Sequence, residues 1–213
     1  MFKETLSKNA KKSLALLGKI EFFRRTYLAG GTAIALQLGH RESKDFDFFT
    51  KEKFNARNLA NELKRRLPNF KLEKVTWGTI MGYIGKIRFT IFYYNYPLLF
   101  KSRSFLGINI ADLRDIAAMK IASISDRGWK RDFIDLYFLI KNRIVTLEDC
   151  LNLYDEKFKE LQQNKAHILK SLIYFEDAEK EKMPKMFQSV TWLEIKRFFE
   201  QEVKNLGKKI IKQ

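Results

Sequence analysis

The sequence predicts an α/β fold, in which a small mixed sheet is flanked by helices and followed by a helical C-terminal part. Three observations support this class. Of the 213 residues, 46% are hydrophobic, which is enough to bury the core of a large domain. The first half contains short strand-like runs separated by glycines, whereas apolar residues in the second half recur at helical spacing. We therefore expect an α/β part at residues 1–109 and a helical part at residues 110–213.

The N-terminal elements follow from local patterns. Apolar residues at helical spacing predict a basic amphipathic helix over residues 13–25. A short strand over residues 27–29 ends at Gly30 and Gly31, after which Thr32 can cap a second helix. Residues 45–50, DFDFFT, begin by alternating acidic and aromatic side chains, which indicates a half-buried strand with both carboxylates on one face.

The remaining elements continue the same division. A helix over residues 59–67 is expected to end near Pro68, and residues 70–94 have the pattern of short strands, with 86–94 (KIRFTIFYY) the clearest. A soft boundary is expected near residues 97–110. Helices are then predicted over residues 113–126 and 131–141, with Gly128 as the turn between them, and over residues 147–158, 166–180 and 190–206.

Composition narrows the function. The chain has 41 Lys and Arg against 25 Asp and Glu, a formal charge of +16, which favours a polyanionic partner such as nucleic acid. A solubilising basic surface is the alternative interpretation. No apolar run approaches the roughly 20 residues that cross a bilayer, and the charged N-terminus does not resemble a signal peptide, so we expect a cytoplasmic protein without a membrane partner. One cysteine and two histidines exclude an internal disulfide and a Cys/His zinc site.

The strongest candidate for chemistry lies at residues 30–47. A glycine pair before a helix lets the backbone approach a phosphate, which the positive end of the helix also favours. Asp45 and Asp47 are about 7 Å apart along a strand and on the same face, so they can converge on Mg²⁺. An ordinary turn and a solvated strand face are the simpler interpretations of each feature. Their combination within one strand-helix-strand stretch favours a functional site.

These residues also carry a family resemblance. The stretch YLAGGTAIALQLGHRESKDFDFF, residues 27–49, resembles the opening motif of polymerase-beta-like nucleotidyltransferases, in the AbiEii/AbiGii toxin branch, where a glycine pair with Ser or Thr precedes an Arg-x-Ser-x-Asp-x-Asp segment. The stretch DLRDIAAMKIASISDRGWKRDFIDLYFL, residues 112–139, is similar to the family's later motifs, a helical lysine followed by Arg-Asp-x-x-Asp-Leu. Because both motifs occur in the expected order, the resemblance is specific.

The resemblance implies a polymerase-beta-like core and a role for each matching residue. The implied catalytic residues are Asp45, Asp47, Lys120 and Asp132, with Asp45 and Asp47 as the magnesium ligands and Lys120 facing the nucleotide phosphates. Asp135 is the alternative to Asp132. The implied nucleotide-binding residues are Gly30, Gly31 and Thr32 in the phosphate-holding turn, with Ser43 beside the metal and Arg41 as a further phosphate contact.

Simpler interpretations exist for several of these residues. An ordinary surface lysine is the alternative interpretation of Lys120. Arg131 and Asp135, four residues apart, have the spacing of a helix-surface pair, which favours Asp132 for the active site. His40 is a candidate general base, although a polar loop contact is the more common role for such a histidine.

One position departs from the family pattern. Polymerase-beta-like enzymes usually draw a third carboxylate from a later strand, but the strand that begins at residue 86 presents no acid, and its one face carries Arg88, Thr90, Phe92 and Tyr94. Either Asp132 or Asp135 supplies the missing oxygen, one metal suffices, or the site binds nucleotide without turning it over.

The expected function is Mg²⁺-dependent transfer of a nucleotide from an NTP to an RNA hydroxyl. The resemblance favours tRNA as the acceptor and implies the toxin of a toxin-antitoxin system, with a cognate antitoxin protein as a partner. A nucleotidyltransferase that modifies a protein hydroxyl, and an inert RNA-binding module on the same fold, are the alternatives.

Overall fold

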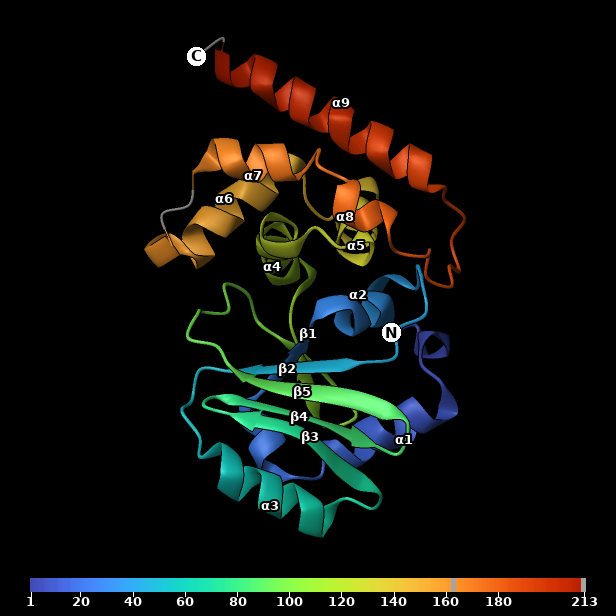
Figure 1. Cartoon of the computed structure of the whole chain (residues 1–213), viewed down its shortest axis with the longest axis vertical. Coiled ribbons are helices and arrows are strands. Elements are labelled where there is room, and N and C mark those ends of the chain that lie inside the picture. Colours follow the sequence, from blue (N-terminus) through green and yellow to red (C-terminus); the bar gives the residue numbers. More distant parts are fainter. Residues whose placement is uncertain (162–163, 212–213) are drawn as a thin grey trace. The chain divides into compact units, whose positions relative to one another are not determined.

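The computed structural model describes residues 1–161 and 164–211, and the chain divides into two compact units, Met1–Asp112 and Leu113–Gln213. The first unit contains a seven-stranded mixed sheet, and the described part of the second is helical (Figure 1). The α/β class with a mixed sheet and a helical C-terminal part is therefore confirmed.

In the first unit, helices and strands alternate between residues 21 and 66, and five strands follow in succession. Its elements are η1 (Lys3–Thr5), α1 (Lys8–Leu17), η2 (Glu21–Arg25), β1 (Tyr27–Ala29), α2 (Gly30–Leu38), β2 (Phe46–Thr50), α3 (Ala56–Arg66), β3 (Phe70–Thr76), β4 (Thr79–Ile84), β5 (Ile87–Tyr93), β6 (Arg103–Phe105) and β7 (Ile108–Ile110). In Figure 1, α2 lies over one face of the sheet and α1 and α3 lie over the other. The sheet is thus the middle layer of this unit.

The strand order places β2 in the centre of the sheet. The order is β3-β4-β5-β2-β1-β7-β6. Strand β2 is antiparallel to β1, with Ala29 opposite Asp47, and parallel to β5, with Asp47 opposite Thr90. The register therefore sets Asp47 between the end of β1 and the middle of β5.

Burial alternates along β2 as the sequence predicts. Phe46 and Phe48 are fully buried, whereas Asp45, just before the strand, and Asp47 are half-buried. The ring of Phe23, in η2, meets Phe48 edge-on at 4.7 Å between centroids. Because neighbouring side chains in a strand point to opposite faces, both carboxylates lie on the face away from this aromatic contact.

The predicted helix over residues 13–25 is wrong in extent. Helix α1 begins earlier, where the Ser7 hydroxyl accepts from the Ala10 amide at 3.1 Å, and it ends at Leu17. A separate 3₁₀ turn, η2, follows. At Gly18 any Cβ would collide with the main-chain oxygen of Leu106, so the tight approach of the β6–β7 turn requires glycine there and interrupts the helix.

Three further expectations are corrected. Helix α2 begins at Gly30 with Ala29 as its N-cap, so Thr32 lies inside the helix and does not cap it. Residues 97–110 contribute two strands that the sequence did not indicate, because each has only three residues. The single helix predicted over 166–180 is two short helices.

The α-helices of the second unit pack against one or the other of two adjacent helices, the first two of the unit. Its elements are α4 (Leu113–Arg127), α5 (Lys130–Lys141), α6 (Leu147–Lys157), η3 (Lys159–Leu161), α7 (Lys165–Ser171), α8 (Glu176–Glu179) and α9 (Trp192–Ile211). The turn between α4 and α5 is at Gly128, as predicted, where φ is +57°. Lys157 and Asp115 form a fully buried ion pair of 2.9 Å between α6 and α4. Among the described residues, none of the helices combines the length and apolar character needed to cross a membrane.

Candidate active site

A glycine turn meets the acidic pair in the first unit. Gly30 follows β1 directly, has φ +67°, and begins α2. A Cβ at this position would lie 3.2 Å from Oδ2 of Asp47. The pairing of Ala29 with Asp47 explains this proximity, because the residue after Ala29 then lies beside the carboxylate. Main-chain amides at the start of α2 and an aspartate carboxylate are thus neighbours.

The segment that carries Asp45 is fastened to α2 through Thr32. The Thr32 hydroxyl donates to the main-chain carbonyl of Asp45 and lies 2.6 Å from Oγ of Ser43. Thr32 is buried, with 1% of its surface exposed, so its hydroxyl serves these contacts. Thr32 and Ser43 therefore hold Asp45 and the glycine turn in one arrangement.

The close approach at Gly30 leads to a test by paired substitutions. Gly30→Ala should cost about 1–2 kcal/mol of stability, because the left-handed backbone disfavours a Cβ. The added methyl group should also displace the Asp47 carboxylate and reduce nucleotide transfer. Gly85→Ala is the matched control, because Gly85 has φ +61° and no atom lies within 4 Å of the place its added methyl group would take. Chemical denaturation measures the stability of both variants, and their nucleotide transfer rates are then compared. If Gly30→Ala and Gly85→Ala lose the same activity, a specific effect on Asp47 is excluded.

The neighbouring strand β5 supplies a cation beside the acidic pair. Arg88 precedes Phe89, the partner of Phe46, and therefore lies next to Asp45. Its Nε donates to Oε2 of Glu73 at 3.0 Å. This hydrogen bond, with a further contribution from the charge of Asp45, raises the pKa of Arg88 above its ordinary value. The sequence placed Arg88 on this face but did not indicate that β5 would pair with β2.

The donor set fits one hard cation shared with a substrate. Thr90 is opposite Asp47 on β5, so this position next to the acidic pair carries a hydroxyl and not a carboxylate. Within residues 1–161 and 164–211, no group of three or more acidic, His or Cys side chains is arranged to hold a metal. Mg²⁺ is commonly held by one or two carboxylates together with substrate phosphates. Asp45 and Asp47 meet that requirement only when a polyphosphate completes the coordination.

Two further residues from the first motif are buried. Arg41 is 4% exposed, and its guanidinium donates to the main-chain carbonyl of Glu42 at 3.0 Å. His40 is fully buried. A buried His40 is poorly placed to exchange protons with solvent, so the structure favours a structural role over that of a general base.

The second motif forms a buried charge cluster in the second unit. The Lys120 ammonium lies 2.7 Å from Oδ1 of Asp132 and 2.7 Å from Oδ2 of Asp135. The Nε of Arg127 donates to Oδ2 of Asp132 at 3.1 Å. Lys120, Asp132 and Asp135 are each at most 5% exposed. We call these four residues the Lys120 cluster; its two cations balance its two carboxylates.

Two simpler interpretations of this motif are wrong. Lys120 is not a surface lysine, because it is buried. Asp135 does not form the expected helix-surface pair: it is fully buried and binds Lys120, whereas Arg131 lies over the ring of Trp129, 5.6 Å from its centroid. From the sequence, Arg127 was not identified as a partner of Asp132. The signal that could have indicated this contact is the position of Arg127, five residues before Asp132 and across the α4–α5 turn.

The charge of Asp132 should contribute to stability in a pH-dependent way. Burial alone would raise the pKa of Asp132, but the positive charges of Lys120 and Arg127 outweigh this effect and hold the pKa below its ordinary value. A carboxylate with a lowered folded-state pKa stabilises the protein above its unfolded pKa, about 3.9, and loses this contribution as the pH falls towards the folded value.

Asp132→Asn should therefore lower the free energy of unfolding by a constant amount at neutral pH, and the gap to the wild type should narrow below about pH 4. Urea unfolding of both proteins across this range measures the gap. A gap that widens on acidification would contradict the assigned charge state.

The predicted site residues thus form two groups. Gly30, Thr32, Ser43, Asp45 and Asp47 are linked within the first unit by the contacts above, and Gly31 continues the same turn. Lys120 and Asp132 are joined to each other within the second unit.

Comparison with known proteins gives one family. A family model described as nucleotidyl transferase AbiEii toxin, type IV toxin-antitoxin system, matches residues 14–80 and 81–207. An uncharacterized protein of Aquifex aeolicus (strain VF5) is 35% identical over 210 residues, which cover 93% of this chain and 96% of that protein.

Solved structures share the fold. MenT4, a nucleotidyltransferase toxin from Mycobacterium tuberculosis H37Rv, superposes with a TM-score of 0.59 at 14% identity, covering 91% of this chain and 80% of that one. JHP933 from Helicobacter pylori superposes with a TM-score of 0.54 at 21% identity, covering 97% of each chain.

Proposed function

The chain belongs to the AbiEii nucleotidyl transferase toxin family of type IV toxin-antitoxin systems, and from this premise we propose that it transfers a nucleotide from an NTP to an RNA hydroxyl in a magnesium-dependent reaction. In this reaction the acceptor oxygen bonds to the α-phosphorus as the bond to pyrophosphate breaks. Membership in the family makes the chain a nucleotidyltransferase toxin; the metal, the acceptor and the residue roles are our proposals.

One observation carries the proposal more than any other. The Asp47 carboxylate lies against Gly30, at the first residue of α2. A carboxylate at a helix start is an ordinary capping arrangement on its own, but here Asp45 lies on the same face and the hydroxyls of Thr32 and Ser43 fix the segment. The arrangement supports a polyphosphate held at the turn and a cation held by the acids.

Asp45 and Asp47 would hold Mg²⁺, because both are half-buried and lie on one strand face. When bound, the ion neutralises charge on the triphosphate and helps to orient the α-phosphate. The rest of the assignment concerns the chain's own groups.

The main-chain amides of Gly30 and Gly31 would donate to phosphate oxygens, with Ser43 beside them. We assign Thr32 and Arg41 to positioning rather than to phosphate contact, because both are buried and bound to the chain's own carbonyls.

The Lys120 cluster contains the lysine that the family resemblance assigns to the nucleotide phosphates. We propose that Lys120 contacts the nucleotide phosphates and that Asp132 orients the Lys120 ammonium, to which it is bound. The Arg127 side chain is 42% exposed and is the outer cation of the cluster.

The charge distribution favours RNA as the acceptor. The first unit has 21 Lys and Arg against 9 Asp and Glu, net +12, and the second has the other 20 and 16, net +4. The unit that carries the acidic pair is therefore the strongly basic one, and a polyanionic acceptor would be attracted to it. Within RNA, tRNA is the acceptor that the family resemblance favours. A protein hydroxyl is the alternative acceptor, and the family also implies a cognate antitoxin.

Labelling identifies both substrates in one experiment. Purified protein is incubated with Mg²⁺ and each NTP in turn, labelled at the α-phosphate, together with total RNA or total protein. We expect label in the RNA fraction, with a preference for tRNA and for one or two of the NTPs. Label in protein alone would replace RNA by a protein acceptor, and no transfer to either fraction would contradict the proposed reaction.

A further inference from the structure

One segment of the first unit has more basic residues than its own acidic residues can pair with. The segment 51–77, which contains α3 and β3, has three acids, and each is in an ion pair: Glu52 with Arg25, Glu62 with Arg66, and Glu73 with Arg88. Seven cations of the segment have no carboxylate partner in the described chain: Lys51, Lys53, Arg57, Lys64, Arg65, Lys71 and Lys74. The segment therefore presents positive charge that the protein itself does not neutralise.

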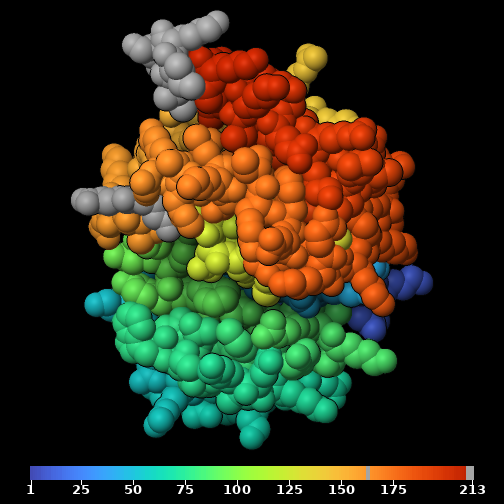
Figure 2. Space-filling view, turned by 45° about the horizontal axis from the view of Figure 1, so that its top comes forward, coloured from blue at the N-terminus to red at the C-terminus, as the bar shows by residue number. Residues whose placement is uncertain are grey.

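Four of these cations line two adjoining hollows beside α3. The first hollow has a volume of about 590 Å³ and contains Lys53, Arg57 and Trp77. The second has about 790 Å³ and contains Lys64 and Arg65. Both include Phe54 and Asn55, so they adjoin at the start of α3; we call them together the α3 groove. In Figure 2, the teal and green atoms of the α3–β5 region form a broad outer surface.

Trp77 is the most exposed large apolar side chain of the groove. It is 80% exposed at the turn between β3 and β4. Its ring meets Tyr93 edge-on at 5.4 Å, and the Tyr93 amide donates to the carbonyl of Gly78 at 2.6 Å. The turn is therefore tied to β5, and the indole is held outward on a rigid hairpin. An aromatic ring in this position can stack with a nucleobase, and such stacking tolerates any base.

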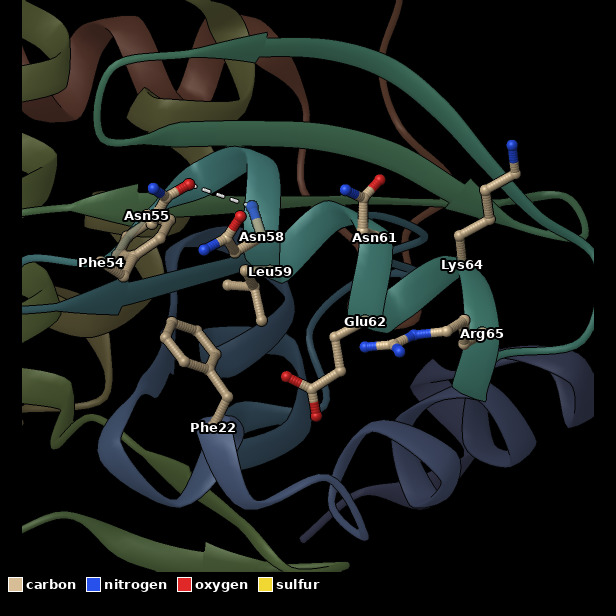
Figure 3. A pocket seen from close by; sticks show the side chains of 9 residues that line it. All are labelled: Phe22, Phe54, Asn55, Asn58, Leu59, Asn61, Glu62, Lys64 and Arg65. Carbon is tan, nitrogen blue, oxygen red and sulfur yellow. Dashed lines mark hydrogen bonds between the residues drawn. The ribbon is translucent and has the colours of Figure 1, made fainter.

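Two asparagine side chains lie between the cations along α3. Figure 3 shows Asn58, Asn61 and Lys64 in one row and Leu59, Glu62 and Arg65 in a second, as their spacing of three residues requires. The Asn55 side chain accepts from the Asn58 amide as the helix cap. Both Asn58 and Asn61 are exposed, and in the described chain their side-chain amides make no hydrogen bond, so they are available to base edges or sugar hydroxyls.

We propose that the α3 groove binds a single-stranded segment of RNA. The cations match phosphates, the exposed indole matches a base, and the amides match polar groups of bases and riboses. An acidic protein would use the cations but would gain less from an exposed indole than a nucleobase that stacks on it. The choice of RNA over DNA rests on the proposed function; the groove itself is separate from the transfer site.

The α3 groove begins only a few residues after the β-strand that carries Asp47. Asp47 lies in β2, which ends at Thr50, opposite Tyr93, and Lys53 follows three residues later. Six residues of extended chain span at most about 22 Å. A bound strand would therefore be anchored near the end of β2, while a hydroxyl elsewhere on the same RNA reaches the acidic pair.

The test measures binding of a fluorescently labelled single-stranded RNA of about 12 nucleotides. Fluorescence anisotropy is recorded without NTP or Mg²⁺, so the result does not depend on catalysis. Trp77→Ala should weaken binding by about 5- to 150-fold, the loss expected for one stacked base, and Trp77→Phe should restore most of it. Affinity for RNA should fall as the salt concentration rises. In the double variant Lys53→Glu with Arg57→Glu this fall should be less steep: the slope of log affinity against log salt should become less negative by about 1.4, at about 0.7 per phosphate contact.

The matched control is Lys8→Glu with Lys12→Glu, two exposed lysines of α1 that give the same change in net charge. We expect it to leave the salt slope almost unchanged. Equal losses in the two double variants, or unchanged binding by Trp77→Ala, would overturn the assignment of the groove. Tighter binding of DNA of the same sequence would overturn the choice of RNA. Failure of nucleotide transfer would affect none of these measurements.

Discussion

Asp47→Asn should reduce nucleotide transfer by more than about 100-fold while leaving the fold intact. The substitution keeps the shape of the side chain but removes the negative charge that, in the proposed reaction, would hold a cation beside Gly30. Metal and electrostatic stabilisation of the transferred phosphoryl group contributes several kcal/mol, and each 1.36 kcal/mol corresponds to about tenfold in rate. Asp45→Asn should have an effect of the same order, because Asp45 lies on the same face of the strand.

The measurement is kcat/KM for the NTP at several Mg²⁺ concentrations, with circular dichroism to verify folding. Glu200→Gln is the matched control, because Glu200 is exposed in α9 and its substitution removes one negative charge outside the first unit. Transfer at the wild-type rate by either aspartate variant would exclude this pair as the metal site.

Lys120→Met should destabilise the protein by about 3–5 kcal/mol. The side chains have similar volume, but the substitution removes the ammonium that lies 2.7 Å from both Asp132 and Asp135. Breaking a buried ion pair by removing one partner leaves uncompensated buried charge, which costs about that much. Arg127 would still contact Asp132, so Asp135 should account for most of the loss.

Adding Asp135→Leu to Lys120→Met should recover much of the stability, because an apolar pair can replace a buried ion pair at little net cost. Urea unfolding measures both variants. A loss below about 1 kcal/mol in the single variant would contradict the buried cluster. If the double variant is stable but its KM for the NTP is still raised, Lys120 acts on the nucleotide and not only on the fold.

Features of the first motif were predictable because they are local. The alternation of DFDFFT specifies which side chains of β2 face the core, and the structure buries Phe46 and Phe48 as expected. The glycine pair likewise indicates the start of α2. The register that sets Ala29 opposite Asp47 was not predictable, because it depends on how β1 and β2 pair.

Features that depend on distant contacts were missed. The end of α1 is set by the approach of Leu106 to Gly18, and nothing in the spacing of residues 13–25 indicates that contact. Asp135 was interpreted as a surface residue because Arg131 lies four positions before it, yet the packing of α5 against α4 turns it towards Lys120. Helical spacing alone does not tell which polar residue faces a neighbouring helix.

A crystal structure with Mg²⁺ and a non-hydrolysable NTP analogue tests the central claim most directly. We expect one metal ion about 2.0–2.1 Å from an oxygen of Asp45 and from an oxygen of Asp47, with the analogue's phosphates at the amides of Gly30 and Gly31. A metal ion that contacts neither aspartate, or a nucleotide bound away from the glycine turn, would contradict the claim.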